Sequence, residues 1–213
     1  MNAAHTIGAY IGKKLGLIPQ DRWIGALERA EPDLVRRRGQ NLEELAARID
    51  TDVDVYLELA GLLSVGETYF LRHGPHFDLM VNHVEQRLCT LAPAESVTIW
   101  SAGCSSGEEP YSIAIALHAR LGPDALERVR IIGTDVDPRA IAKAERARYT
   151  AWSFRGAPPW LLPTYFAREP SGGATLEHPG VRRAVRFQAM PLATRAPMFP
   201  DGSLDIVFFR NVA

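Results

Sequence analysis

The sequence has little cysteine, no long apolar run and almost no net charge. Two cysteines, Cys89 and Cys104, are too few for a disulfide framework and indicate a reducing compartment. No apolar stretch approaches the ~18 residues that a membrane-spanning helix needs, and the first residues do not resemble a signal peptide. The 24 basic and 25 acidic residues leave a net charge of −1, which gives nucleic acid no bulk attraction. We therefore expect a soluble, cytoplasmic protein without membrane insertion and without a nucleic-acid partner.

The sequence pattern of the first 91 residues predicts a small helical domain and a linker. Apolar residues follow helical spacing in segments that Gly39 and residues 50–54 separate, which predicts several short helices. Pro32 is expected to break the basic segment 21–38, which would otherwise form one helix.

From residue 92 to residue 213 we predict a second domain, in which strands and helices alternate. Strands are expected at 97–100, 129–133, 185–187 and 204–209, with helices at about 111–121 and 138–149. This order is typical of α/β proteins with a doubly wound parallel sheet. Residues 151–180 are rich in proline, glycine and aromatic residues, and they receive no assignment. Four strands with the last at the terminus would leave apolar groups uncovered, so we expect a sheet that is incomplete at the C-terminus.

The loop after the first predicted strand carries two glycines, Gly103 and Gly107. A glycine turn that leads into a helix lets a ligand approach the backbone, but this spacing is not the G-x-G-x-x-G dinucleotide pattern. Glu108 and Glu109 begin the helix, where they would repel a pyrophosphate and attract a cation such as the amino group of a methionyl ligand. The alternative is that both acids simply favour a helix N-terminus.

Asp135 ends the second predicted strand, where an acid can accept hydrogen bonds from both hydroxyls of a ribose. A helix cap is the other interpretation, but Asp137, just before Pro138, fits that role better. A nucleoside site with acids in place of a phosphate-binding feature favours S-adenosylmethionine as the cofactor.

Three other features have plainer interpretations. His73 and His76 lack a third ligand at metal-site spacing, so no metal site is predicted. Cys104 is interpreted as a small packing residue. The basic residues Arg22, Arg29 and 36–38 could be a solvated helix face or a contact for an acidic partner.

The segment 99–114, Ile-Trp-Ser-Ala-Gly-Cys-Ser-Ser-Gly-Glu-Glu-Pro-Tyr-Ser-Ile-Ala, closely resembles the cofactor loop of CheR-type methyltransferases. Residues 66–72, 134–137 and 208–212 resemble three further motifs of that family, in the same order. The resemblance implies a Rossmann-like class I methyltransferase domain after the helical one. It also implies the methylation of glutamate side chains on bacterial chemoreceptors, with S-adenosylhomocysteine as the product.

The resemblance also implies which residues form the site. With Gly103 of the glycine loop, the expected cofactor contacts are Thr68, Arg72, Glu109, Asp135, Pro191, Leu192, Arg210 and Asn211. Pro191 stands where the family has an asparagine, so only a backbone contact is expected there; Gly66 and Leu71 also depart from the family pattern. Arg72 is the expected catalytic residue because it could hold the incoming carboxylate.

The partners that the resemblance implies are the acidic, glutamate-bearing helices of chemoreceptors, and we expect a monomer. Family members continue beyond the R-N-V motif with a tyrosine segment and further strands, and some carry a small β-subdomain; all of these are expected to be missing. The activity of this chain alone is therefore in doubt. A non-catalytic cofactor-sensing or protein-binding remnant is the main alternative, and a nucleotide-dependent dehydrogenase is a distant one.

Overall fold

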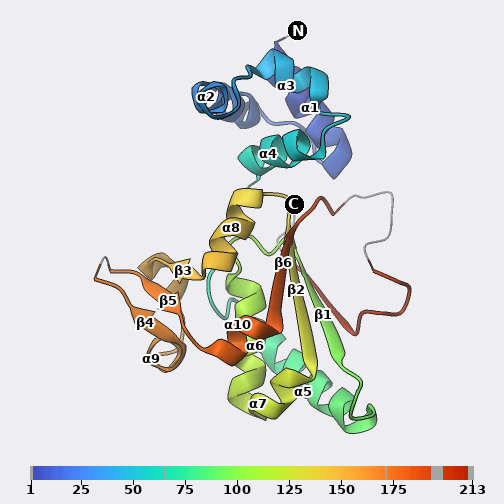
Figure 1. The fold of residues 1–213 in the computed structure, drawn as a ribbon, viewed down its shortest axis with the longest axis vertical. Helices are drawn as coiled ribbons and strands as arrows, with labels where there is room; N and C mark the ends of the chain where they lie inside the picture. The colour runs from blue at the N-terminus through green and yellow to red at the C-terminus, as the bar shows by residue number, and fades with distance from the viewer. Residues whose placement is uncertain (1, 65, 171, 193–198, 211–213) are drawn as a thin grey trace.

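The computed structural model describes residues 2–64, 66–170, 172–192 and 199–210. Four helices, α1 (Ala3–Leu15), α2 (Asp21–Arg38), α3 (Leu42–Arg48) and α4 (Val53–Leu63), form a unit at the top of Figure 1. Side-chain capping defines where α1, α3 and α4 begin. Asn2 accepts from Ala4 N–H, Asn41 and Glu44 form a capping box, and the Asp52 carboxylate caps α4.

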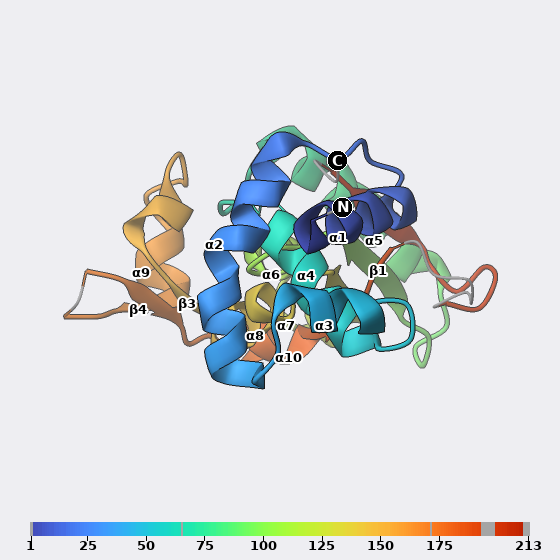
Figure 2. The ribbon, with the colours of Figure 1, turned by 90° about the horizontal axis from the view of Figure 1, so that it is seen from above.

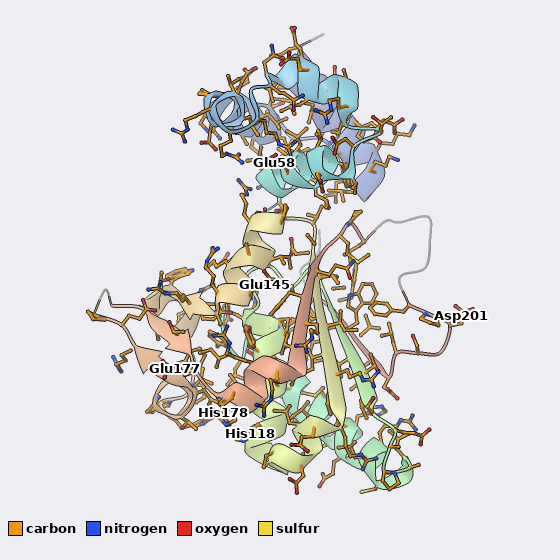
Figure 3. All side chains as sticks on the ribbon, viewed as in Figure 1. Glu58, His118, Glu145, Glu177, His178 and Asp201 are labelled. Atoms are coloured by element: carbon orange, nitrogen blue, oxygen red, sulfur yellow. The ribbon has the colours of Figure 1, made fainter. Side chains whose placement is uncertain are left out.

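Helix α2 runs unbroken through Pro32, so the predicted break is wrong. Pro32 lies on the exposed side of the helix, whereas Leu27 and Leu34 are fully buried in the core of the helical unit. A proline removes one backbone hydrogen bond, but the packing of these leucines holds both halves of the helix in line. Glu58 of α4, labelled in Figure 3, adds ion pairs with Arg37 (2.7 Å) and Arg38.

The main sheet is parallel, as predicted, with the order β6-β2-β1-β7. Its strands are β1 (Val97–Ala102), β2 (Val129–Asp135), β6 (Val185–Ala189) and β7 (Ile206–Phe209). The chain moves outward from β1 in one direction to β2 and β6, and in the other direction to β7. The carboxyl ends of β1 and β7 therefore flank a point where the order reverses, which is where open α/β sheets bind ligands.

The two faces of this sheet differ in how far other elements bury them. Ile99 and Ile131 are buried in a core that also contains side chains of α5 (Gly74–Thr90) and α6 (Glu108–Leu121). Helices α7 (Pro123–Glu127), α8 (Pro138–Arg146) and α10 (Pro179–Ala184) complete this layer (Figure 1). On the opposite face, Val207 and Phe209 are 47% and 62% exposed.

A second, three-stranded antiparallel sheet lies within the segment that the sequence left unassigned. Its order is β3-β5-β4, from β3 (Arg148–Tyr149), β4 (Phe166–Arg168) and β5 (Ala174–Leu176). The short helices η1 (Ala151–Phe154) and α9 (Leu161–Tyr165) accompany it, set off to one side of the molecule in Figure 2. Two expectations were therefore wrong. A small β unit is present, and α8 ends at Arg146 because Ala147 adopts a left-handed conformation (φ 54°).

The buried apolar residues form two separate clusters. One cluster draws its buried members from residues 4–63, and the other from Phe70 to Phe208, including α5. The domain limits 1–91 and 92–213 stay a prediction. None of the helices in the described part of the chain combines the length and apolar character needed to cross a membrane.

Candidate functional site

A cavity of about 560 Å³ lies where the helical unit meets the carboxyl ends of the parallel strands. Residues from both units line it, which is a common place for a small-molecule site. The cavity brings together seven of the nine residues that the sequence analysis proposed for the site: Thr68, Arg72, Gly103, Glu109, Asp135, Leu192 and Arg210. Pro191 does not line it, although the neighbouring Leu192 does, and Asn211 lies outside the described residues.

The glycine loop is held against β2 by its own backbone. Gly103 N–H and Cys104 N–H both donate to the Thr134 carbonyl, at 2.8 and 2.9 Å. Gly107 has a φ of 89°, and a Cβ there would lie 2.6 Å from the Cβ of Ala144. Only glycine fits this position, so the turn between β1 and α6 is closely specified.

Asp135 lies at the end of β2 with its side chain buried. Its Oδ2 accepts from Ser105 N–H (2.7 Å) and its Oδ1 accepts from Asp137 N–H (2.9 Å). Burial raises the pKa of the Asp135 carboxyl, and these two backbone donors oppose that shift. Asp137 caps α8 as predicted, accepting from Arg139 N–H. Asp135 is thus a fixed carboxylate, and each of its oxygens can accept a further hydrogen bond.

The adjacent acids Glu108 and Glu109 point to different surroundings. Glu108 is 1% exposed and accepts from the hydroxyls of Ser106 and Ser153, both at 2.7 Å. Glu109 lines the cavity, where it accepts from Ser101 Oγ at 2.7 Å. Of the two, only Glu109 is placed to meet a ligand in this cavity.

Arg210 connects the end of β7 to the rest of the site. Its Nη2 lies 2.6 Å from Oε2 of Glu109, and its Nη1 donates to the Arg72 carbonyl at 2.9 Å. Nη1 also lies 3.1 Å from Nδ1 of His76. Most of the hydrogen-bonding capacity of Arg210 is therefore directed to protein groups that border the cavity.

Arg72 lies in a tight turn, and not all of its N–H donors are used by the protein. Its Nη1 donates to the Glu67 carbonyl at 3.1 Å, and its guanidinium lies 5.4 Å from the Tyr69 ring. The Nε of Arg72 is buried and has no hydrogen-bond partner within the described ranges. A buried donor without a partner is unfavourable unless an acceptor arrives, so this arginine fits an anionic ligand group.

The sequence analysis missed one wall of the cavity. The connection between α1 and α2, with Gly16, Leu17, Ile18 and Gln20, lines it together with Arg22 and Trp23. Ile18 is 85% exposed, although it is a large apolar residue in a short loop. In the sequence, the two apolar residues Leu17 and Ile18 stand between Gly16 and Pro19, and apolar residues in so short a loop are the local signal that could have indicated this wall.

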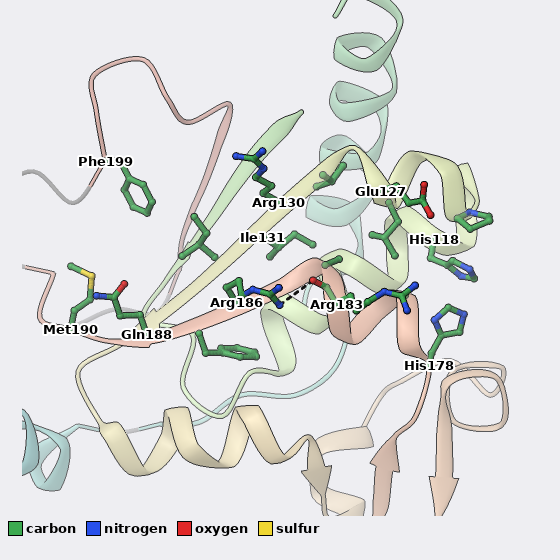
Figure 4. Close-up of a pocket in the computed structure, with 17 residues that line it drawn as sticks. His118, Glu127, Arg130, Ile131, His178, Arg183, Arg186, Gln188, Met190 and Phe199 are labelled. Carbon is green, nitrogen blue, oxygen red and sulfur yellow. Dashed lines mark hydrogen bonds between the residues drawn. The ribbon is translucent and has the colours of Figure 1, made fainter. Parts of the chain in front are cut away.

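A second cavity, of about 1040 Å³, runs along β2 and β6 (Figure 4). None of the proposed site residues lines it, and its charged residues include Arg130, Arg183 and Arg186. At one end, the rings of His118 and His178 lie 4.3 Å apart, and burial lowers the pKa of His118. The described residues contain no cluster of three or more histidine, cysteine or acidic side chains suited to a metal ion.

The smaller cavity has the chemistry that S-adenosylmethionine requires. Asp135 has oxygens able to accept from hydroxyl groups such as those of a ribose, and Glu109, paired with Arg210, presents a carboxylate that suits a cationic group. Gly103 lines the cavity with a φ of 72°, so the backbone can approach the cofactor without a side chain between them. The residues present therefore fit this cofactor.

Known proteins resemble the chain over most of its length. A family model described as "CheR methyltransferase, SAM binding domain" matches residues 66–213. The chain is 34% identical over 150 residues to chemotaxis protein methyltransferase 2 of Vibrio cholerae, covering 70% of this chain and 52% of that protein. It is 30% identical over 205 residues to the probable biofilm formation methyltransferase WspC of Pseudomonas putida, covering 95% and 47%.

The chemotaxis protein methyltransferase of Escherichia coli is 32% identical over 152 residues, covering 70% of this chain and 50% of that protein. The chain thus spans about half the length of these relatives. The family match covers more than half of the chain, and S-adenosylmethionine is the cofactor of the matched domain. The protein belongs to the CheR methyltransferase family.

Proposed function

We propose that this chain binds S-adenosylmethionine for the methylation of glutamate side chains on chemotaxis receptors. The products would be glutamate methyl esters and S-adenosylhomocysteine. One observation carries the proposal: a single cavity is lined by two carboxylates suited to the cofactor and by an arginine suited to the substrate. The family match and the names of the relatives support the same reaction class.

Five residues are proposed to hold the cofactor. Asp135 takes the ribose hydroxyls, Glu109 takes the amino group, and Gly103 gives access to the backbone. Thr68 and Leu192 line the same cavity and complete the contact surface. Arg210 supports this arrangement through its ion pair with Glu109.

Arg72 is proposed as the catalytic residue because its free donors can hold the carboxylate that receives the methyl group. A glutamate side chain has a pKa near ~4.3, so it is already ionised at neutral pH and needs no general base. The bound cofactor supplies an activated methyl group. The remaining task for the protein is to align the two reactants, which can contribute a large part of the rate acceleration.

The proposed partner is an acidic helix of a receptor, which the basic residues of α2 would meet. Arg22 lines the cavity, and Arg29 and Arg36 lie on the same helix. Arg36 pairs with Asp33 at the surface, and Arg37 and Arg38 are less available because both pair with the buried Glu58. One relative is named for biofilm formation, so a receptor of such a pathway is a substrate candidate beside a chemotaxis receptor. We also propose that the protein is a monomer and that it is located in the cytoplasm.

The test is a transfer assay with S-adenosylmethionine that carries a radiolabelled methyl group. The substrate is a receptor fragment whose methyl-accepting glutamates are unmethylated, and the matched control has glutamine at those positions. We expect base-labile label, as methyl esters give, on the first fragment only. Binding of S-adenosylhomocysteine without any transfer would instead favour the non-catalytic alternative.

A further inference from the structure

The turn that carries Arg72 has an unusual backbone. Leu71 and His73, the residues on either side of Arg72, have φ values of 56° and 63°. Residues with a Cβ rarely adopt this left-handed region, and a bulky residue such as leucine does so only when its surroundings impose it. Some contact must therefore hold the turn in this conformation.

Ser112, in the second turn of α6, makes that contact. Its Oγ accepts from Leu71 N–H at 2.8 Å and donates to the Glu108 carbonyl at 2.5 Å. The hydroxyl is fully buried, so both of its hydrogen bonds are shielded from water. The bond reaches Leu71 itself, which is the first left-handed residue and the direct neighbour of Arg72.

The neighbouring residues are held separately. Phe70 N–H donates to the Ser153 carbonyl at 2.9 Å, and the Phe70 ring is fully buried among Tyr149, Phe154 and Phe166. On the far side, Arg210 donates to the Arg72 carbonyl at 2.9 Å. Between these two anchors, Ser112 is the side chain that bonds to Leu71 among the described residues.

We propose that Ser112 is a positioning residue: its hydroxyl fixes the left-handed turn at Leu71 and so directs the Arg72 guanidinium into the cavity. The inference rests on the proposed function insofar as Arg72 holds the substrate carboxylate. Ser112 itself does not line the cavity. It acts through the backbone of Leu71 and has no direct contact with either reactant.

The first test is structural and needs no activity. Ser112→Ala removes the acceptor of Leu71 N–H, and Ser112→Cys keeps the side-chain size with a much weaker acceptor. In both variants we expect faster hydrogen exchange at the Leu71 amide and a changed three-bond HN–Hα coupling, as φ leaves the left-handed region. Ser153→Ala is the matched control, because it removes another buried hydroxyl that bonds to the Glu108 side chain. An unchanged Leu71 coupling and exchange rate in both Ser112 variants would overturn the inference.

The second test is kinetic and uses a double-mutant cycle with Leu71→Gly. Glycine adopts a positive φ without strain, so the Ser112 hydroxyl should matter less in that background. We expect Ser112→Ala to lower methyl transfer by about tenfold or more in the wild-type background and by less than about threefold beside Leu71→Gly. The affinity for S-adenosylhomocysteine should stay the same.

The outcomes separate the two proposals. If the wild-type chain transfers no methyl group, the proposed function fails, and the Leu71 coupling still decides the role of Ser112. If the wild type is active and Ser112→Ala loses equal activity in both backgrounds, the positioning role is wrong.

Discussion

The two walls of the cavity are built in different ways. The wall from the α/β unit is charged and hydrogen-bonded: Asp135, Glu109 and Arg210 each contact at least one other group that borders the cavity. The wall from the helical unit consists mainly of the short loop around Ile18, whose side chain is mostly exposed, and Arg22 is the charged residue that it contributes among the described residues. One wall presents fixed charges, and the other presents mainly apolar surface.

This difference indicates which wall orients the ligand and determines specificity. Fixed carboxylates and donors give orientation and specificity, because they are costly to leave without a partner. A loop that belongs to a separate core can shift without disturbing them. We therefore expect substitutions in the α/β wall to have large effects and substitutions in the helical wall to have small ones.

The largest effect is expected for Arg210→Ala. This change leaves the Glu109 carboxylate, in a side chain that is 12% exposed, without its ion-pair partner. Removing one partner of a buried pair costs roughly 3 kcal/mol of unfolding free energy. Urea unfolding measures it, and Arg120→Ala is the control because its pair with Asp78 is exposed and worth less than about 1 kcal/mol. Equal losses in the two variants would show that the charged wall is not held by this pair.

Asp135→Ala tests the ligand side of the same wall. Charge-assisted hydrogen bonds to two ribose hydroxyls are worth roughly 1.5–3 kcal/mol each, so affinity for S-adenosylhomocysteine should fall at least tenfold. Calorimetry on a folded sample measures it. Asp137→Ala is the matched control: it removes the cap of α8 and should cost about 1 kcal/mol of stability with unchanged affinity. If Asp135→Ala binds as tightly as the wild type, the carboxylate is only a structural acceptor for Ser105 and Asp137.

The pH dependence of the affinity for S-adenosylhomocysteine should reflect the protonation of Asp135. Burial raises the pKa of Asp135 above the ordinary value of 3.8, so it takes up a proton at a higher pH than an exposed aspartate does. The protonated form accepts hydrogen bonds from the ribose poorly. Affinity should therefore be constant near neutral pH and should fall as the pH is lowered through the raised pKa, still above 3.8. In Asp135→Ala this component of the pH profile should be absent.

The sheet and the α/β wall could be predicted because their signals are local. The strand before Gly103, the helix after Gly107 and the acid that ends β2 lie in short segments whose spacing indicates a nucleoside site. The same local signals do not show which of Glu108 and Glu109 faces the ligand. Successive residues on a helix point about 100° apart, and which of them meets the cavity depends on how α6 packs.

Other features depend on contacts that no local pattern records. The strands β3, β4 and β5 have two or three residues each, which is too short for alternation to be visible. Pro32 is tolerated because Leu27 and Leu34 of the same helix are buried against other helices of the helical unit. The loop around Ile18 reaches the cavity only because the helical unit lies over the carboxyl ends of the strands.

The smallest effect is expected for Ile18→Ser, in the helical wall. The side chain is 85% exposed, so little of its apolar surface is removed from water in the free protein. The change should alter affinity for S-adenosylhomocysteine by less than about threefold, or roughly 0.6 kcal/mol. Val53→Ser, at an exposed position of α4 that does not line the cavity, controls for the loss of surface apolar area. A tenfold loss at Ile18 with no loss at Val53 would show that this loop closes on the ligand, and the contrast between the two walls would then be wrong.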